Sequence, residues 1–376
     1  MAISAAGIIF SNLNENTASR LTSDRTVAAI PFACRYRLID FCLSNMVNAN
    51  ISNINVAVNY NYRSLVEHIG SGKDWDLARR ETGIKIISPY QMANSQGAPM
   101  FSSRLQALRA MREYIKDFKE DYVVLMDSDN VLNIDIQSLL KAHKISGAEI
   151  TVVTERAPIT FTSKTPRIML SSIQGKITDI VMGTSYNPDA PEISLNIFVM
   201  KTDYLRKLIA EADGYDLTSL TALLLSTYKR ASYCTFLHEQ YVATLSSFND
   251  YYRCSMELLK SEKSRNSLIF KKEFPIFTRV HNSAPTLHKS GANIKNSLIA
   301  DECTIEGTVI NSIIFRGVHI GKGAIVKDSI LFHGTYVEDM AELCCIVTDK
   351  DVQITSGVKL FGNENMPFYV RKGRKV

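Results

Sequence analysis

The 376-residue chain lacks the sequence features that several classes of protein require. It has no C-x-x-C pair and no Cys/His spacing typical of a metal site, and its seven cysteines are an odd number. We therefore expect reduced, mostly buried thiols in a cytoplasmic protein. The net charge of +5 is small, and no basic run is long enough to predict nucleic-acid binding. The apolar stretch 2–10 has no cationic start and is too short to cross a bilayer, so we expect no membrane role.

Glycine is missing from the first predicted loop. Residues 5–10 predict a buried strand, 38–47 a helix with an apolar stripe, and 51–58 a second strand, which together make a βαβ unit with a parallel sheet. No glycine lies between Gly7 and Gly70. A loop that holds a triphosphate needs glycine for close backbone approach and cations to match the charge. This loop therefore does not carry the residue types that bind phosphates.

The last third of the chain has a different periodicity. Apolar residues recur every six positions, first at Ile299 and Ile305 and then at Ile314, Ile320, Val326 and Phe332. This is the pattern of hexapeptide repeats, in which each repeat forms one edge of a triangular coil and stacked coils bury the apolar column. The extended, proline-containing stretch before the repeats predicts a connection. We expect domains at 1–262 and 291–376, joined by a linker at 263–290.

Residues 37–45, Arg-Leu-Ile-Asp-Phe-x-Leu-Ser-Asn, followed by Asn-Ala-Asn-Ile at 48–51, carry a family resemblance. They resemble the first helix of the bacterial ADP-glucose pyrophosphorylases, the glucose-1-phosphate adenylyltransferases, and the resemblance extends over nearly the whole chain. It implies an α/β Rossmann-like nucleotidyltransferase domain with a mixed, mostly parallel sheet. It also implies that the carboxyl-terminal repeats form a left-handed parallel β-helix.

The same resemblance marks departures at the substrate-binding positions. Of the family's two metal-binding aspartates, one corresponds to a vestigial Asp129 and the other is replaced by Thr244. Three further substrate positions differ from the family. The family's lysine of the first loop corresponds to a position near Val27, its sugar-phosphate lysine to Gly183, and its tryptophan to Val242. A Gly-Thr-Ala signature for the nucleotide base corresponds to Ser103-Arg104-Leu105.

Two positions at which the family contacts the sugar keep the family's residue in this chain, Ser194 and Asp216. Each acidic candidate also has a structural interpretation. Asp127 and Asp129 follow the strand 122–126 and could cap the helix predicted at 136–143, and Asp216 could cap a helix at 217–229.

The resemblance implies a regulatory second subunit, non-catalytic or weakly catalytic, that forms a heterotetramer with the catalytic homologue. We expect no cofactor or metal in this chain, and Mg²⁺ only in that partner. A phosphosugar or phosphate effector is expected, with Arg25, Arg35, Arg371 and Lys372 as candidate ligands, although the basic end of the chain could equally be a solvated tail.

Two other functions remain open. An active adenylyltransferase or related sugar-phosphate nucleotidyltransferase could use a divergent site. Hexapeptide-repeat acyltransferases use a histidine as a base, and the repeats of this chain contain His319 and His333.

Overall fold

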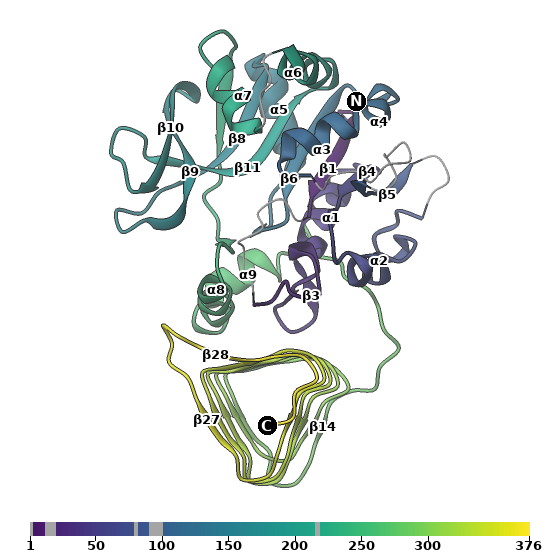
Figure 1. Ribbon diagram of the computed structural model, residues 1–376, viewed down its shortest axis with the longest axis vertical. Helices are drawn as coiled ribbons and strands as arrows, with labels where there is room; N and C mark the ends of the chain where they lie inside the picture. Colours follow the sequence, from purple (N-terminus) through teal and green to yellow (C-terminus); the bar gives the residue numbers. More distant parts are fainter. Residues whose placement is uncertain (1–2, 12–19, 79–81, 90–100, 215–218) are drawn as a thin grey trace.

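The computed structural model describes residues 3–11, 20–78, 82–89, 101–214 and 219–376. Within them an amino-terminal α/β domain, built on one large sheet, lies above a carboxyl-terminal coil of short parallel strands (Figure 1). Both parts of the predicted fold class are confirmed. In these ranges no helix is long and apolar enough to span a membrane.

The large sheet has nine strands in the order β5-β4-β1-β6-β11-β8-β12-β10-β9. Strands β5, β4, β1 and β6 run parallel, whereas β11 is antiparallel to both of its neighbours β6 and β8. The sheet is therefore mixed, and its four consecutive parallel strands lie at the edge formed by β5. Its strands are β1 (Ala5–Phe10), β4 (Asn53–Ala57), β5 (Gly83–Ile87), β6 (Tyr122–Asp127), β8 (Ile150–Arg156), β9 (Thr162–Ile173), β10 (Lys176–Ser185), β11 (Glu192–Lys201) and β12 (Tyr233–Leu237).

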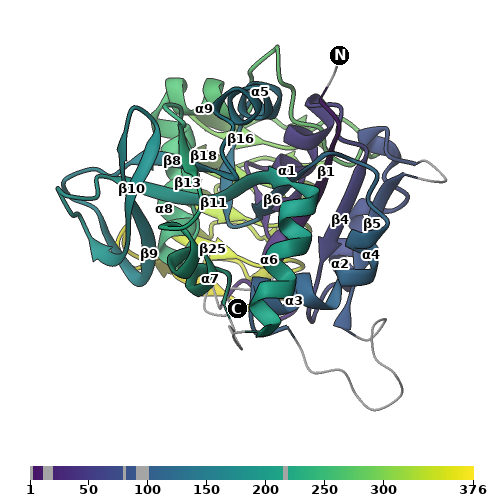
Figure 2. The same ribbon diagram turned by 90° about the horizontal axis from the view of Figure 1, so that it is seen from above.

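Helices cover both faces of this sheet because its central strands are apolar on both sides. Along β1, Ile8 and Phe10 belong to one buried cluster and Ile9 to another. Helices α3, α4, α6 and α7 supply the first cluster, and α1, α2 and α5 the second (Figure 2). The helices are α1 (Leu38–Asn48), α2 (Arg63–Ile69), α3 (Arg104–Ala110), α4 (Arg112–Lys116), α5 (Ile136–Ser146), α6 (Thr202–Gly214), α7 (Leu220–Thr227), α8 (Phe248–Lys260) and α9 (Glu262–Leu268).

The apolar residues spaced at helical intervals over 105–118 predict a single helix, but this segment forms two helices, α3 and α4. Met111 ends α3 with φ −79° and ψ 3°, and its side chain is fully buried. The guanidinium of Arg206 on α6 donates to the carbonyls of Ile115 and Phe118 at 3.1 and 2.9 Å. Contacts with α6 thus favour a redirected α4 over a continuous helix.

The carboxyl-terminal domain is the predicted left-handed parallel β-helix, with three faces of five strands each. Ile320 pairs with Val337 and Val326 with Leu343, in each case 17 positions further along the chain, whereas Ile305 pairs with Ile320 only 15 positions further on. The strands of the first face are β14 (Leu287–His288), β17 (Thr304–Ile305), β20 (His319–Ile320), β23 (Tyr336–Val337) and β26 (Gln353–Ile354). Those of the second are β15 (Asn293–Lys295), β18 (Thr308–Ile310), β21 (Ile325–Lys327), β24 (Glu342–Cys344) and β27 (Lys359–Phe361). Those of the third are β16 (Leu298–Ile299), β19 (Ile313–Ile314), β22 (Ile330–Leu331), β25 (Ile346–Thr348) and β28 (Phe368–Val370).

Phe332 corrects the predicted apolar column of the β-helix. The column inside the coil continues from Val326 to Leu331, a step of five residues, and Phe332 points out of the coil. There its ring packs edge-on against Phe315 and Tyr251, with centroids 5.0 and 6.2 Å away. Phe332 is therefore buried between the two domains, where the third face of the β-helix meets α8.

Short elements complete the junction between the domains. A hairpin of β2 (Pro31–Phe32) and β3 (Tyr36–Arg37) precedes α1, and β7 (Asn130–Leu132) pairs with β13 (Val242–Thr244). Two single-turn 3₁₀ helices lie at Val27–Ala29 and Lys73–Trp75. Within the stretch assigned to the linker, α9 comes first and β14 last. Between them, Phe277 and Ser44 exchange hydrogen bonds that hold this segment against α1.

Candidate functional site

The amino-terminal sheet has a crevice where ligands of α/β proteins commonly bind. From β1 the chain crosses to β4 and β5 on one side, and later to β6 on the other side. In such sheets the ligand site lies at the carboxyl ends of the strands where the order reverses. Here those ends are Phe10 and Asp127, which are register partners. We call this place the switch-point crevice.

Arg104, which the resemblance places in the changed nucleotide-base signature, enters the switch-point crevice and binds Asp127. The Arg104 Nε donates to Asp127 Oδ1 at 2.8 Å, and its Nη2 donates to Oδ2. Burial raises the pKa of Asp127 to about 6, although the guanidinium opposes this change. The Asp127 carboxylate in turn raises the pKa of Arg104 against the effect of burial. The pair thus forms a bidentate salt bridge between a partly buried arginine and a buried aspartate.

The structure brings Asp129 and Thr244 together, the two positions that the resemblance assigned to metal binding. Strands β7 and β13 pair Asn130 with Thr244, and the Leu245 N–H donates to the Asp129 carbonyl at 2.9 Å. The Thr244 hydroxyl donates to the amide oxygen of Asn130 at 2.9 Å. Asp135, rather than Asp127 or Asp129, caps α5 by accepting from the Ser138 N–H.

These residues do not fit a Mg²⁺ ion. A divalent cation of this kind prefers carboxylate oxygens in near-octahedral geometry. The place of the second carboxylate holds a hydroxyl that is bonded to Asn130, and both oxygens of Asp127 accept from Arg104. Among the described residues, no group of three or more Asp, Glu, His or Cys side chains could hold a metal.

The sugar side of the site keeps a serine and gains a cation. Ser194 is 1% exposed, and its hydroxyl accepts from the Asn196 N–H where β11 bulges. Gly183 lies opposite Arg167 in the β9–β10 ladder, and Arg167 Nη2 donates to the Ser194 carbonyl at 3.3 Å. A cation, Arg167, therefore lies beside the position of the lost lysine. Comparison at position 183 alone does not reveal this cation, because Arg167 lies on β9, the strand that pairs with β10.

The remaining positions marked by the resemblance have structural roles or cannot be placed. Val27 is buried in the first 3₁₀ turn, and Val242 packs against the core beneath α1 and α5. Asp216 and the loop 12–19 lie outside the described residues. Ser219, not Asp216, caps the helix that follows, because its hydroxyl accepts from the Ala222 N–H.

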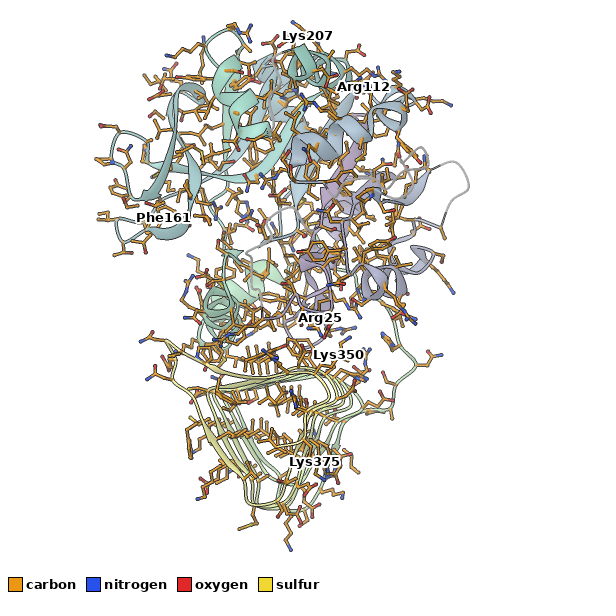
Figure 3. The ribbon with its side chains drawn as sticks, in the orientation of Figure 1. Arg25, Arg112, Phe161, Lys207, Lys350 and Lys375 are labelled. Carbon is orange, nitrogen blue, oxygen red and sulfur yellow. The ribbon has the colours of Figure 1, made fainter. Side chains whose placement is uncertain are left out.

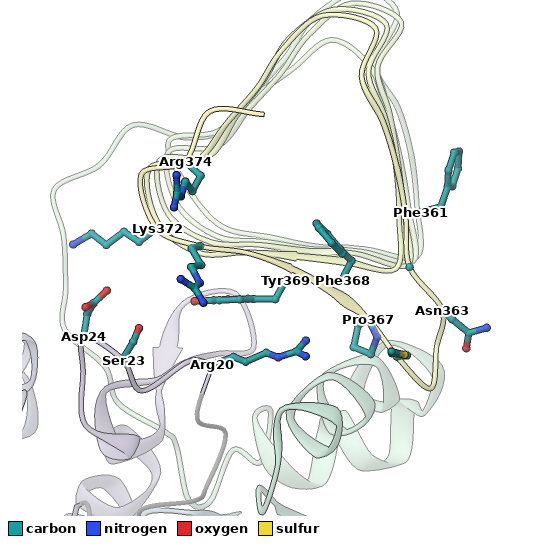
Figure 4. A pocket seen from close by; sticks show the side chains of 13 residues that line it. Arg20, Ser23, Asp24, Phe361, Asn363, Pro367, Phe368, Tyr369, Lys372 and Arg374 are labelled. Atoms are coloured by element: carbon teal, nitrogen blue, oxygen red, sulfur yellow. The ribbon is translucent and has the colours of Figure 1, made fainter.

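A second candidate site is a groove of about 1160 Å³ between the first loop and the last coil of the β-helix (Figure 4). We call it the basic groove. Arg371 and Lys372, both predicted as anion ligands, line it together with Arg20 and Arg374. Asp24 is the one acidic side chain among its described lining residues. Aromatic rings of Phe361, Phe368 and Tyr369 complete the wall.

Arg25 lies beside the basic groove but is already paired. Its Nη2 donates to Asp349 Oδ1 at 2.6 Å across the domain boundary, and both side chains are almost completely buried. The Tyr369 hydroxyl donates to the other carboxylate oxygen at 2.5 Å. Burial and the charges of Arg37 and Arg25 lower the pKa of Lys350, on the facing coil, to about 8 (Figure 3). The junction is thus strongly electropositive.

The other predicted side chains lie elsewhere. Arg35 is exposed on the β2–β3 hairpin and lies over the ring of Tyr36, 5.8 Å from its centroid. His319 stacks on Tyr336 with centroids 4.3 Å apart, and His333 Nδ1 is 2.9 Å from the Arg316 carbonyl. All seven cysteines are free thiols, as expected.

Comparisons with known proteins agree with both domains. Residues 19–163 match the nucleotidyl transferase family, and residues 282–366 match the GlmU-like carboxyl-terminal hexapeptide family. The glycogen biosynthesis protein GlgD of Bacillus subtilis (strain 168) is 31% identical over 98% of this chain and 95% of its own length. GlgD of Geobacillus stearothermophilus is 32% identical over 94% of this chain and 92% of its own. A glucose-1-phosphate adenylyltransferase of Clostridium perfringens (strain 13 / Type A) is 30% identical over 85% of this chain and 80% of its own length. The chain therefore belongs to the bacterial glucose-1-phosphate adenylyltransferase family, in its GlgD group.

Proposed function

We propose that this chain is a non-catalytic or weakly catalytic regulatory subunit of ADP-glucose pyrophosphorylase in glycogen biosynthesis. It associates with the catalytic homologue in a heterotetramer in the cytoplasm and modulates the conversion of ATP and glucose 1-phosphate to ADP-glucose and pyrophosphate. The observation that carries this proposal is the Arg104–Asp127 salt bridge in the switch-point crevice. A crevice whose carboxylate already pairs with an internal arginine is poorly suited to a metal-bound triphosphate.

Loss of catalysis follows from how such enzymes work. Phosphoryl transfer depends on positioning and on neutralising charge, and each electrostatic contact contributes about 2–4 kcal/mol. Glycine stands at the sugar-phosphate lysine position, and threonine stands at a metal-ligand position. Losing several such contacts together lowers turnover by many orders of magnitude.

The basic groove supports binding of an anionic effector. Among the described lining residues, four cationic side chains accompany a single carboxylate, and the aromatic rings beside them can pack against a sugar. Arginine and lysine bind phosphates through charge-assisted hydrogen bonds. We assign a phosphosugar or inorganic phosphate to this groove, with Arg371 and Lys372 among its ligands. No metal, cofactor, nucleic acid or membrane is part of the proposal.

Co-purification with the catalytic homologue from the same genome tests the proposal. The chain alone, with Mg²⁺ and both substrates, should release negligible pyrophosphate. Mixed with the homologue, it should form a complex by size exclusion with light scattering and change that enzyme's response to phosphosugars. Absence of a complex, or robust turnover by the chain alone, would contradict it.

An active enzyme with a divergent site is the second candidate. Arg167 beside Ser194 favours it, because a cation there could pair with a sugar phosphate. Turnover by the purified chain that disappears in Arg167→Ala, with unchanged folding, would select this alternative. The hexapeptide acyltransferase alternative gains no support from His319, which stacks on Tyr336.

A further inference from the structure

We propose that Arg104 acts as a resident cation, which keeps the switch-point crevice closed to a divalent metal and to the nucleotide that such a metal would carry. The inference rests on the proposed function and deepens it, because it names the residue that holds the crevice inactive. It follows from the misfit between Mg²⁺ and the residues at the carboxyl end of β6.

The geometry of the pair carries the inference. The guanidinium binds both carboxylate oxygens of Asp127, through Nε at 2.8 Å and through Nη2. The side chains of Arg104 and Asp127 are 15% and 5% exposed. A bidentate arginine therefore binds both oxygens of the carboxylate two residues before Asp129, the position that the resemblance assigns to metal binding, and Asp127 is not free to support a metal there.

The charge balance of the crevice supports the same conclusion. Three charged groups act on Asp127: the carboxylate of Asp129 and the guanidinium groups of Arg104 and Arg167. Two cations and two carboxylates leave no net charge to attract either a divalent cation or a polyphosphate. Removing the Arg104 charge would leave an excess of carboxylate at this end of β6.

Arg104 is held in place by the start of α3. The Ser103 hydroxyl accepts from the Gln106 N–H at 3.2 Å, and the Gln106 side chain accepts from the Ser102 N–H at 2.7 Å. The next residue, Leu105, is fully buried in the core. The capped and anchored turn thus fixes the backbone from which the Arg104 side chain reaches Asp127.

Titration of Mn²⁺, followed by electron paramagnetic resonance of the free ion, tests the inference on the full chain. Wild type should leave Mn²⁺ unbound up to about 1 mM, the weak end of protein–cation affinities. Arg104→Ala and Arg104→Gln should each lower the Kd at least about tenfold. Adding Asp127→Asn should abolish the gain. Arg104→Gln keeps most of the side-chain length, so it tests the charge if Arg104→Ala does not fold.

The matched control is Arg112→Ala, which removes an exposed salt bridge to Asp213 one helix further on and should bind Mn²⁺ as wild type does (Figure 3). Folded Arg104 variants with no gain in Mn²⁺ binding would overturn the inference, as would wild-type binding that Asp127→Asn removes. Co-purification of Arg104→Ala with the catalytic homologue reports on the proposed function separately.

Discussion

The switch-point crevice and the basic groove both contain arginines, but they use them in opposite ways. In the crevice, Arg104 is partly buried and bound to Asp127 through both carboxylate oxygens. In the groove, Arg371 and its neighbours line an open cavity with one acidic residue among its described lining. The comparison teaches that the number of cations at a site says little about ligand binding until their partners are known.

The largest expected effect concerns the buried salt bridge between Arg25 and Asp349, beside the basic groove. Arg25→Met should leave Asp349 buried without its cation, which costs about 3–5 kcal/mol of unfolding free energy. Arg35→Met, on the exposed hairpin, should change it by less than about 0.5 kcal/mol. Urea denaturation of both variants measures the difference. Equal losses of unfolding free energy in the two variants would mean that Arg25 contributes no more to stability than an exposed arginine.

A smaller effect is expected for the groove cations themselves. Arg371→Ala and Lys372→Ala should each weaken binding of glucose 6-phosphate about tenfold, because each removes one charge-assisted contact. Affinity should also fall between pH 7 and 9, since Lys350 loses its proton near pH 8. Calorimetry measures both effects, and Lys350→Arg should flatten the pH profile. Unchanged affinity in both alanine variants would show that the groove is not the anion site.

The smallest expected effect is the pH dependence of the crevice. The folded-state pKa of Asp127 is about 6, above its usual value, so its contribution to stability is full at acidic pH and is lost as pH rises through that value. Arg104→Ala removes the group that opposes this rise, which moves the folded-state pKa higher. Arg104→Ala should therefore destabilise the protein about 1 kcal/mol more at pH 8 than at pH 5. Urea denaturation at both pH values checks this, and the same loss at both would contradict it.

Local patterns in the sequence predicted much of the fold. The βαβ unit at 5–58 and the six-residue period of the repeats depend on neighbours in the chain, so both could be read before the structure was known. Phe332 shows where this approach fails. Its spacing matched the inner column of the coil, but the ring is buried against Tyr251, which lies in another domain.

The candidate site was less predictable because its partners are distant in sequence. The resemblance assigns Asp129 and Thr244 to one site, and β7 and β13 pair beside them, with Asn130 opposite Thr244. Arg104 could have been noticed as a cation where the family signature has small residues. Its partner, however, lies 23 positions further on, and no local pattern indicates that contact.

The pairing of Arg25 with Asp349 has a consequence for the order of folding. The two residues are 324 positions apart, so one belongs to the first loop made by the ribosome and the other to the last coil. Contacts of such long sequence separation form late, because the intervening chain must be ordered first. During synthesis the amino-terminal domain can fold while the repeats are still emerging. The basic groove is therefore assembled only after the last coil of the β-helix has been synthesised, and a chain cut before that coil would possess the sheet but not the groove.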